Sequence, residues 1–216
     1  DLLMDVEQKV LQDTITQLDS ALAEQQKAFE TIKSKYTLVK DAEYQTVGSY
    51  IWPTQSIEKN LHRSFLRFQV SELGVMSMTS IYCGGSNIHH VRVKVTAPDG
   101  SFAETPASGD SYETSDKGEK IEKADYKLGE DGDVIKFIML NKDNNLRVQL
   151  IGDRSFSTTM MPADRQAAVN VYILEQILAS IQQIKKGKED ANLKLGFIIK
   201  KRENMAEKAA VAKKND

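Results

Sequence analysis

The first 47 residues of the chain contain neither proline nor glycine, and their apolar side chains recur at alternating steps of three and four. The repeat positions are Met4, Leu11, Ile15, Leu18, Leu22, Phe29, Ile32, Tyr36 and Val39, with Gln8 and Gln25 in two further slots. An apolar seam of this period, sustained over about five heptads, is the signature of a coiled coil. We therefore predict one long helix over residues 1–47.

The C-terminal part of the chain repeats this pattern. Pro162 suits the first turn of a helix, and no proline follows it. The seam positions are Ile177, Ile181, Ile184, Lys188, Ala191, Leu195, Ile198, Arg202, Met205, Ala209 and Ala212. Gly187 and Gly196 each cost about 1 kcal/mol relative to alanine in a helix, so packing must supply stability that local propensity does not. We predict a second helix over residues 162–216.

Charge indicates how these two helices pair. Residues 1–43 hold nine acids and five bases, whereas residues 185–216 hold ten bases and five acids. Opposite charges on facing helices favour an antiparallel coiled-coil stalk. Its seam would consist of Leu11, Ile15, Leu18, Leu22, Phe29 and Ile32 against Ile177, Ile181, Ile184, Leu195 and Ile198. The alternative is a pair of ordinary amphipathic helices folded over a sheet.

Other large apolar side chains lie outside this two-helix seam. Phe29, Tyr36, Phe197 and Ile199 indicate more apolar surface than a single facing helix covers. We therefore expect a homo-oligomer, most simply a dimer held together by a four-helix bundle.

The middle of the chain changes character. A linker over residues 48–60 leads into short runs rich in β-branched and aromatic residues over 61–161, separated by turn residues. The predicted strands are Ser64–Glu72, Val75–Cys83, Ile88–Thr96, Asp133–Leu140 and Leu146–Ile151. We expect a long loop over the polar segment 103–132, with a short strand around 121–128. The predicted fold class is α+β, with two long helices flanking an antiparallel sandwich or barrel-like domain.

The stretch from Tyr82 to His90 holds the only cysteine and two of the three histidines. A hairpin turning over residues 84–87 would send His89 to the buried face and leave Cys83 and His90 together on the wetter face. These two side chains are the candidate metal ligands, but zinc needs a further protein ligand. A metal-dependent enzyme using Cys83 and His90 is the third functional interpretation. The sequence contains no familiar catalytic or nucleotide-binding motif, and we expect no cofactor.

Three aromatic residues are candidates for ligand contact. Tyr112 and Tyr126 fall in the polar segment, where we expect them to be exposed. Trp52, the only tryptophan, precedes Pro53 and could either stack on a ligand or fill the junction between helix and sheet. Binding of a glycan or peptide by the β region is therefore the alternative functional interpretation.

Charge and hydropathy exclude two classes of interaction, with nucleic acid and with the interior of a membrane. A net charge of −2 argues against a surface that binds nucleic acid, and no apolar run reaches the ~20 residues that cross a bilayer. Peripheral or lipid-anchored membrane attachment stays open. The start at Asp1 favours a processed, exported protein of the periplasm or cell envelope, with a cytoplasmic location as the alternative. The favoured function is a non-catalytic adaptor whose stalk presents a β head to a protein partner.

Overall fold

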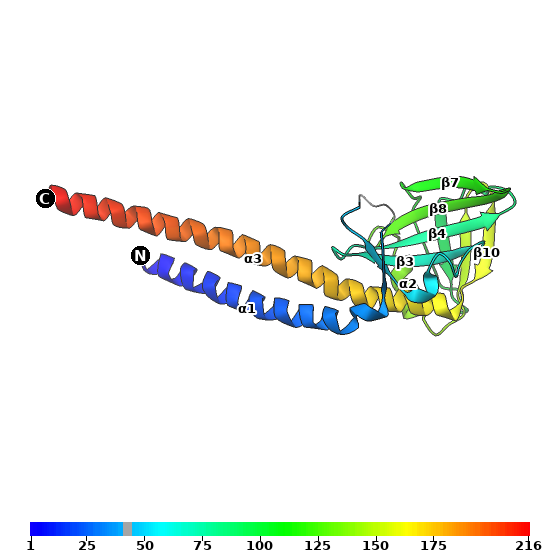
Figure 1. The fold of residues 1–216 in the computed structure, drawn as a ribbon, viewed down its shortest axis with the longest axis horizontal. Helices are drawn as coiled ribbons and strands as arrows, with labels where there is room; N and C mark the ends of the chain where they lie inside the picture. Colours follow the sequence, from blue (N-terminus) through cyan, green and yellow to red (C-terminus); the bar gives the residue numbers. More distant parts are fainter. Residues whose placement is uncertain (41–44) are drawn as a thin grey trace. The chain divides into compact units, whose positions relative to one another are not determined.

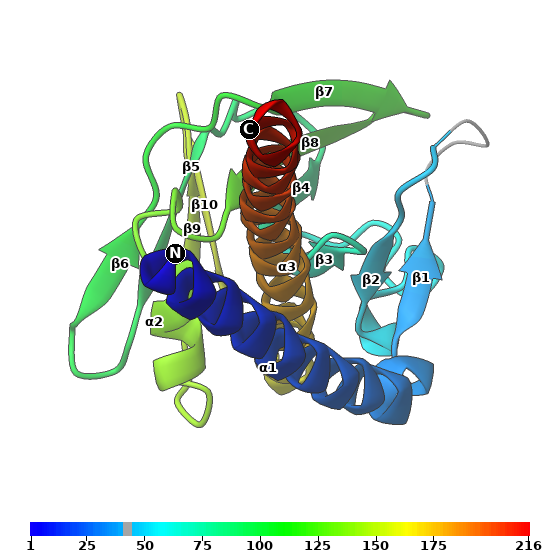
Figure 2. The same ribbon diagram turned by 90° about the vertical axis from the view of Figure 1, so that its left-hand side faces the viewer.

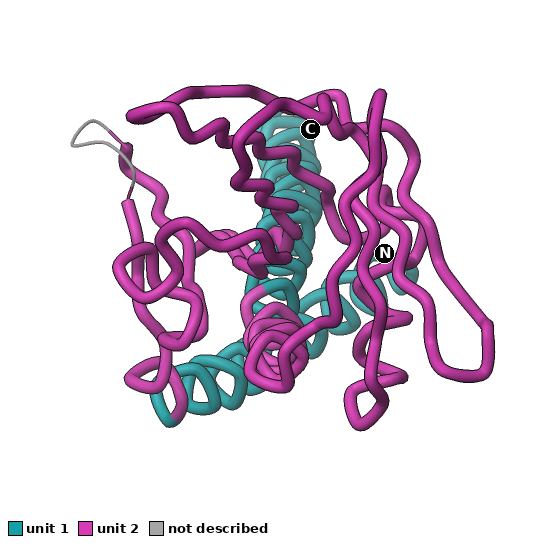
Figure 3. The backbone as a smooth tube through the Cα atoms, turned by 90° about the vertical axis from the view of Figure 1, so that its right-hand side faces the viewer, with its two compact units in different colours: residues 1–31, 179–216 teal, residues 32–178 magenta. Residues whose placement is uncertain are grey.

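The computed structural model describes residues 1–40 and 45–216, and the fold is α+β (Figure 1). The elements in chain order are α1 (Leu2–Ile32), η1 (Lys33–Lys35), β1 (Thr37–Val39), β2 (Ser49–Ile51), η2 (Pro53–Gln55), β3 (Phe65–Ser71), β4 (Met76–Gly84), β5 (Arg92–Thr96), β6 (Phe102–Glu104), β7 (Ser111–Asp116), β8 (Glu119–Lys127), α2 (Val134–Leu140), β9 (Arg147–Ile151), β10 (Ser155–Thr159) and α3 (Pro162–Asn215). The chain divides into two compact units (Figure 3). Unit 1 consists of Asp1–Thr31 with Ala179–Asp216, and unit 2 is Ile32–Leu178.

Unit 1 is a pair of antiparallel helices, as the sequence predicts (Figure 1). The carboxylate of Asp5 pairs with the guanidinium of Arg202, and further along the pair Asp19 meets Lys188. A Cβ added to Gly187 would lie 3.5 Å from a methyl group of Leu18, so this glycine faces α1. Position 5 of α1 pairs with position 202 of α3, and position 19 pairs with position 188, so the two helices run antiparallel.

The seam side chains of unit 1 are only partly shielded from solvent. The expected seam residues from Leu11 to Ile32 and from Ile177 to Ile198 are at least half-buried, and Ile181 and Ala191 are buried. The later seam positions Met205, Ala209 and Ala212 are exposed. Beyond Arg202 every residue of α3 is exposed. Because Asp5, near the start of α1, already pairs with Arg202, the last turns of α3 extend past the described part of α1.

The first helix ends at Ile32, well before position 47. Residues 33–35 form a single 3₁₀ turn, and the chain then enters sheet A as β1 and β2. The hydroxyl of Tyr36 donates a hydrogen bond of 2.6 Å to the carbonyl of Asn170, and its ring meets Trp52 edge-on at 5.3 Å. Tertiary contacts therefore override the helical period. Residues 41–44 of the expected helix lie outside the described residues.

Unit 2, called the β domain below, contains two antiparallel sheets around one core. Sheet A has the strand order β1-β2-β3-β4-β8-β7, and sheet B has the order β10-β9-β5-β6. Figure 2 shows the strands of the two sheets on opposite sides of the first turns of α3. Buried side chains in this core include Leu66, Phe68, Val70, Met76 and Met78 from sheet A, Val93, Val95, Val148 and Leu150 from sheet B, Ile135 and Ile138 from α2, and Ala167, Val171 and Leu174 from α3. The start of α3 is thus part of the β domain.

The segment expected to be a strand at 133–140 is the helix α2. The buried carboxylate of Asp131 accepts hydrogen bonds from the amides of Asp133 and Ile135, which organises the first turn. Gly132 has φ +63°, and a Cβ there would lie 2.1 Å from the carbonyl oxygen of Glu104. Only glycine fits at this position, so the chain can turn sharply into α2.

The polar segment expected to be a long loop forms a β-hairpin instead, and the short strand expected around 121–128 is present as β8. Strands β7 and β8 pair across a two-residue turn in which Lys117 and Gly118 have φ of +50° and +85°. Positive φ at both positions is the requirement of a type I′ turn. β8 also pairs along most of β4, so this segment lies inside sheet A rather than outside the domain.

The expected hairpin between β4 and β5 does not form. β4 pairs with β3 and β8 in sheet A, whereas β5 pairs with β6 and β9 in sheet B. The carboxylate of Glu122 on β8 accepts hydrogen bonds from the amides of Ile88, His89 and His90. These bonds hold the connecting segment while the chain crosses from one sheet to the other.

Candidate functional site

The outer face of sheet A carries an ordered array of polar side chains. Along β3, Leu66 and Phe68 point into the core, so Phe65, Arg67 and Gln69 point outward. The strand register aligns these residues with β4 and β8 in three consecutive rows, which are Gln69–Ser77–Lys127, Arg67–Thr79–Asp125 and Phe65–Ile81–Lys123. The face therefore changes from polar to apolar along the strands.

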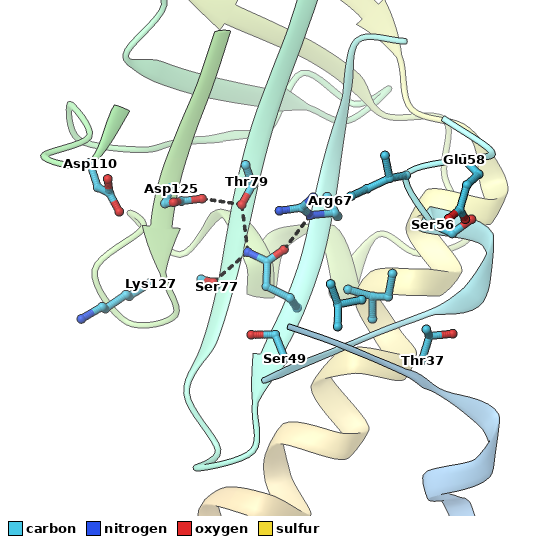
Figure 4. A pocket seen from close by; sticks show the side chains of 14 residues that line it. Thr37, Ser49, Ser56, Glu58, Arg67, Ser77, Thr79, Asp110, Asp125 and Lys127 are labelled. Carbon is cyan, nitrogen blue, oxygen red and sulfur yellow. Dashed lines mark hydrogen bonds between the residues drawn. The ribbon is translucent and has the colours of Figure 1, made fainter. Parts of the chain in front are cut away.

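A cavity of about 400 Å³ lies over the polar rows (Figure 4). Its lining residues are Thr37, Val39, Ser49, Ile51, Ser56, Ile57, Glu58, Arg67, Gln69, Ser77, Thr79, Asp110, Asp125 and Lys127. They come from β1 and β2, the segment after η2, the three central strands, and the loop before β7. All of them belong to unit 2.

Hydrogen bonds join the polar rows into one chain (Figure 4). Arg67 Nε donates to Gln69 Oε1 at 3.1 Å, and Gln69 Nε2 donates to Ser77 Oγ at 2.8 Å and Thr79 Oγ1 at 2.9 Å. The Thr79 hydroxyl in turn donates to the carboxylate of Asp125. Both ends of the Gln69 amide are thereby fixed. The terminal nitrogens of Arg67 make no hydrogen bond within the part of the chain that the structure describes.

Among the acidic residues that line this cavity, Asp125 has a shifted pKa. Burial raises the pKa of its carboxyl group, and the neighbouring Asp110 raises it further, while Thr79 and Arg67 oppose the shift. A negative charge at Asp125 is therefore held at a cost in the folded protein.

Other polar groups of the cavity are uncommitted. The hydroxyl oxygen of Ser56 is buried without a hydrogen-bond partner among the described residues. Glu58 and Lys127 also line the cavity, and neither forms an ion pair with another described residue. Buried polar atoms are usually satisfied, so an unpaired hydroxyl in a cavity is a candidate ligand contact.

A second cavity of about 190 Å³ adjoins the first over the apolar row. Phe65, Ile81 and Ile121 form its apolar part, and Arg67 and Ile57 line both cavities. We call the two adjoining cavities the sheet A groove. Cys83 also lines the apolar end, where burial and the nearby Glu119 raise the pKa of its thiol. A raised pKa lowers the thiolate fraction and hence the reactivity of this cysteine.

A separate polar chain lies inside the core. His90 Nε2 is 2.8 Å from Ser80 Oγ, and His90 Nδ1 is 2.9 Å from Glu122 Oε1. The order hydroxyl, imidazole, carboxylate is that of an activated nucleophile. However, the Ser80 and His90 side chains are fully buried, so a substrate has no approach to the hydroxyl. We interpret this chain as a structural network.

Glu122 is saturated with hydrogen bonds. Its Oε2 accepts from the amides of Ile88 and His89, and its Oε1 accepts from the amide and the ring of His90. Burial raises the pKa of Glu122, but these hydrogen bonds outweigh that effect and leave the pKa below its ordinary value. The buried carboxylate is therefore held in its charged form.

The two sequence candidates for metal ligation are not brought together. Cys83 lies on the outer face of sheet A, whereas His90 is bonded to Ser80 in the core. Among the described residues, the three groups that do converge are His89, Glu113 and Glu122, whose ligand atoms lie within 4.8 Å of one another. Four hydrogen bonds already occupy the lone pairs of Glu122, so this set offers an ion only two available ligands.

His89 takes the place on the surface that the hairpin interpretation assigned to His90. Its ring is exposed and lies 2.6 Å from the Glu113 carboxylate, and this hydrogen bond raises the pKa of His89. Its φ of +54° is unusual for a residue other than glycine. Glu122 holds the amide of His89, which explains how this backbone conformation is maintained.

The three aromatic candidates lie in different environments. Tyr126 is 4% exposed, and its hydroxyl donates to the carbonyl of Val91, so it belongs to the core rather than to an exposed loop. Tyr112 is exposed on β7, with the Lys123 ammonium 5.8 Å from its ring centre. Trp52 is half-buried against Tyr36. These three rings therefore do not form one stacking platform.

The residues that matter most in the sheet A groove were absent from the sequence candidates. Arg67 and Gln69 alternate with Leu66, Phe68 and Val70, so their outward orientation could have been inferred from the period of two. Their proximity to Asp125 could not be inferred, because it depends on pairing between β4 and a strand some fifty positions later.

Comparison of the chain with protein-family models, curated proteins and solved structures gave no match. None of the described helices combines the length and the apolar character required to cross a membrane.

Proposed function

We propose that this protein is a non-catalytic adaptor, in which unit 1 assembles copies of the chain and the β domain binds a partner. The observation that carries this proposal is the apolar surface of unit 1. Val6, Val10 and Phe197 are each more than half exposed, and they line a shallow, largely apolar depression of about 460 Å³ between the two helices. Exposed apolar patches of this kind are typical of interaction sites.

The occupant we propose for this surface is a second copy of the chain. α1 is mainly acidic and the distal part of α3 is mainly basic. A two-fold axis that sets α1 of one copy beside α3 of the other would oppose these charges while covering the apolar side chains. The product would be a four-helix bundle, a common assembly for amphipathic helices of this period.

Sedimentation equilibrium over a range of protein concentrations tests the assembly. We expect the wild-type chain to dimerise and the double variant Val10→Gln, Phe197→Gln to be monomeric, with unchanged helicity by circular dichroism. Val211→Gln is the matched control, because Val211 is equally exposed but lies on the part of α3 beyond α1. A wild-type monomer at the highest soluble concentration would refute the assembly.

Ligand binding by the β domain is the second candidate function. It is favoured by the sheet A groove, which combines an uncommitted arginine with an unpaired buried hydroxyl. Of the two ligand classes under consideration, the groove favours a peptide over a glycan. None of the described residues that line the polar cavity is aromatic, and sugar rings are commonly bound by stacking on such side chains.

Export to the cell envelope belongs to the same proposal. Fractionation of cells that express the native gene tests it, since the adaptor would be found with envelope proteins. Recovery only from the cytoplasmic fraction would refute this part of the proposal and leave the assembly unaffected.

A further inference from the structure

We propose that the sheet A groove binds an extended peptide segment that presents a carboxylate to Arg67 and a large apolar side chain to the neighbouring apolar cavity. This inference deepens the partner-binding half of the proposed function, and it does not depend on assembly through unit 1. It names the chemistry of the partner and the residue that recognises it.

Arg67 is built as a receptor for a carboxylate. Its Nε is held by Gln69 Oε1 at 3.1 Å, and the amide of Gln69 is itself held by Ser77 and Thr79. The guanidinium is thus fixed on one side, and its two terminal nitrogens remain as donors toward the groove. A planar fork of this kind bonds a carboxylate through two parallel hydrogen bonds. Because the fork is fixed in advance, little side-chain entropy is lost on binding.

The apolar cavity is placed one row from Arg67. Phe65 precedes Arg67 by two residues on β3, and its row partner Ile81 is on β4. Neighbouring rows on the same face of a sheet are about 7 Å apart, which is also the spacing of every second side chain in an extended peptide. A peptide lying along the strands would therefore place a carboxylate at Arg67 and an apolar side chain two positions away in the apolar cavity.

The sizes of the two cavities favour a peptide over a long-chain fatty acid. The apolar cavity, at about 190 Å³, is half the size of the polar cavity, at about 400 Å³. A long-chain fatty acid would need a large apolar cavity for its acyl chain and only a small polar one for its carboxylate. The polar cavity is lined by Thr37, Ser49, Ser56 and Ser77, whose hydroxyl groups can pair with peptide amides.

The charges around Arg67 give the inference a second, independent test. Asp125 lies in the same row as Arg67, with Thr79 between them, and Asp110 is close to Asp125. A bound carboxylate would be repelled by these acids, whereas a bound amine would be attracted by them. Replacing Asp125 with asparagine keeps an acceptor for Thr79 and removes one negative charge. A carboxylate ligand should therefore bind Asp125→Asn more tightly than the wild-type chain, and an amine ligand should bind it less tightly.

The probe is a library of immobilised random peptides, used in one arm with free C-termini and in another with amidated C-termini. We expect enrichment of sequences in which a carboxylate and a large apolar residue are two positions apart. Enrichment only in the free arm identifies a terminal carboxylate, and enrichment in both identifies Asp or Glu. Both results support the inference. The absence of any enriched sequence, or enrichment without a carboxylate, would overturn it.

Solution titrations of the best peptide with variants assign the contact. We expect Arg67→Gln to weaken binding about tenfold or more, Arg67→Lys to weaken it less, and Asp125→Asn to strengthen it severalfold. Arg147→Gln is the control, because Arg147 is exposed on β9 in the other sheet. Trp52 fluorescence checks that each variant is folded. Unchanged affinity in Arg67→Gln and Arg67→Lys, or weaker binding in Asp125→Asn, would overturn the inference. Sedimentation of the same samples keeps this outcome separate from a failure of assembly.

Discussion

The two units of the chain bury their apolar side chains to very different extents. In the β domain Phe68, Met78 and Leu174 have no exposed surface, whereas the large apolar residues Leu193 and Phe197 of unit 1 are 59% and 65% exposed. The β domain therefore encloses a core of its own. A pair of helices that shields its seam only in part depends on further contacts for stability. The contrast agrees with the roles that we propose for the two units, because an open apolar surface can associate and a closed core can hold a binding site rigid.

The helix α3 takes part in both environments. Its first part, up to Leu178, supplies buried residues to the β domain, and its remainder pairs with α1. One uninterrupted helix thus has a fully packed segment and a partly solvated segment. This makes α3 a good place to compare the two units with identical substitutions.

The largest effect is expected from Glu122→Ala. The change leaves the amides of Ile88, His89 and His90 without their acceptor inside the domain, so we expect a loss of about 3–5 kcal/mol in the free energy of unfolding. Urea denaturation followed by Trp52 fluorescence measures it. Glu113→Ala, which removes only the exposed partner of His89, should change stability by less than about 0.5 kcal/mol. Equal effects of the two variants would refute the structural role of the buried network.

The lowered pKa of Glu122 also predicts how the stability of the wild-type chain depends on pH. A carboxyl group whose pKa is lower in the folded state adds stability above its unfolded pKa and loses that contribution as the pH falls through the folded pKa. We therefore expect the wild-type chain to lose stability in acid more steeply than Glu122→Ala does. Parallel profiles would contradict this assignment.

The next effect compares the two segments of α3 directly. Leu174→Ala empties a site in the closed core, and we expect it to cost about 2–5 kcal/mol. Leu195→Ala acts at a half-buried position of the helix pair, and we expect about 1 kcal/mol or less. Chemical denaturation monitored by circular dichroism and by Trp52 fluorescence separates the units. A larger loss for Leu195→Ala would show that unit 1 is packed more completely than its exposure indicates.

A smaller effect of opposite sign is expected from Asp125→Asn. Because burial and Asp110 raise the pKa of Asp125, the folded protein binds this proton more tightly than the unfolded chain does. Wild-type stability must therefore fall as the pH rises from the unfolded pKa through the folded pKa. We expect the variant to gain less than about 1 kcal/mol above this range and nothing below it. A loss of stability at neutral pH would indicate that the attraction of Thr79 and Arg67 for the charge of Asp125 outweighs burial and Asp110.

The smallest effect concerns the surface of the β domain. The hydrogen bond from Glu113 raises the pKa of His89, so Glu113→Gln should move that pKa back toward the ordinary value of histidine. An NMR titration of the imidazole protons measures the change.

The strands show where sequence patterns suffice and where they fail. β3, β5 and β9 lie within the expected segments, and β4 passes its expected end by one residue, because alternation along each strand is a local property. The strand prediction for residues 133–140 was wrong because this short apolar run fits either a strand or a buried helix, and the hydrogen bonds of Asp131 favour the helix α2. The sequence candidates missed the sheet A groove for a different reason. Arg67 is near Asp125 only because β8 inserts beside β4, and no local pattern encodes that pairing.

The sequence by itself determined the two long helices and their antiparallel pairing. Heptad spacing and the opposite net charges of the two segments can both be read directly from the order of the residues. Tertiary structure alone decided where α1 ends, how β7 and β8 join sheet A, and which groups line the groove. In each of these cases the deciding contact joins residues far apart in the chain, such as Tyr36 with Asn170 or Glu122 with His90. Local periodicity carries no information about such contacts, whose energy is gained only when the two sheets close around the start of α3.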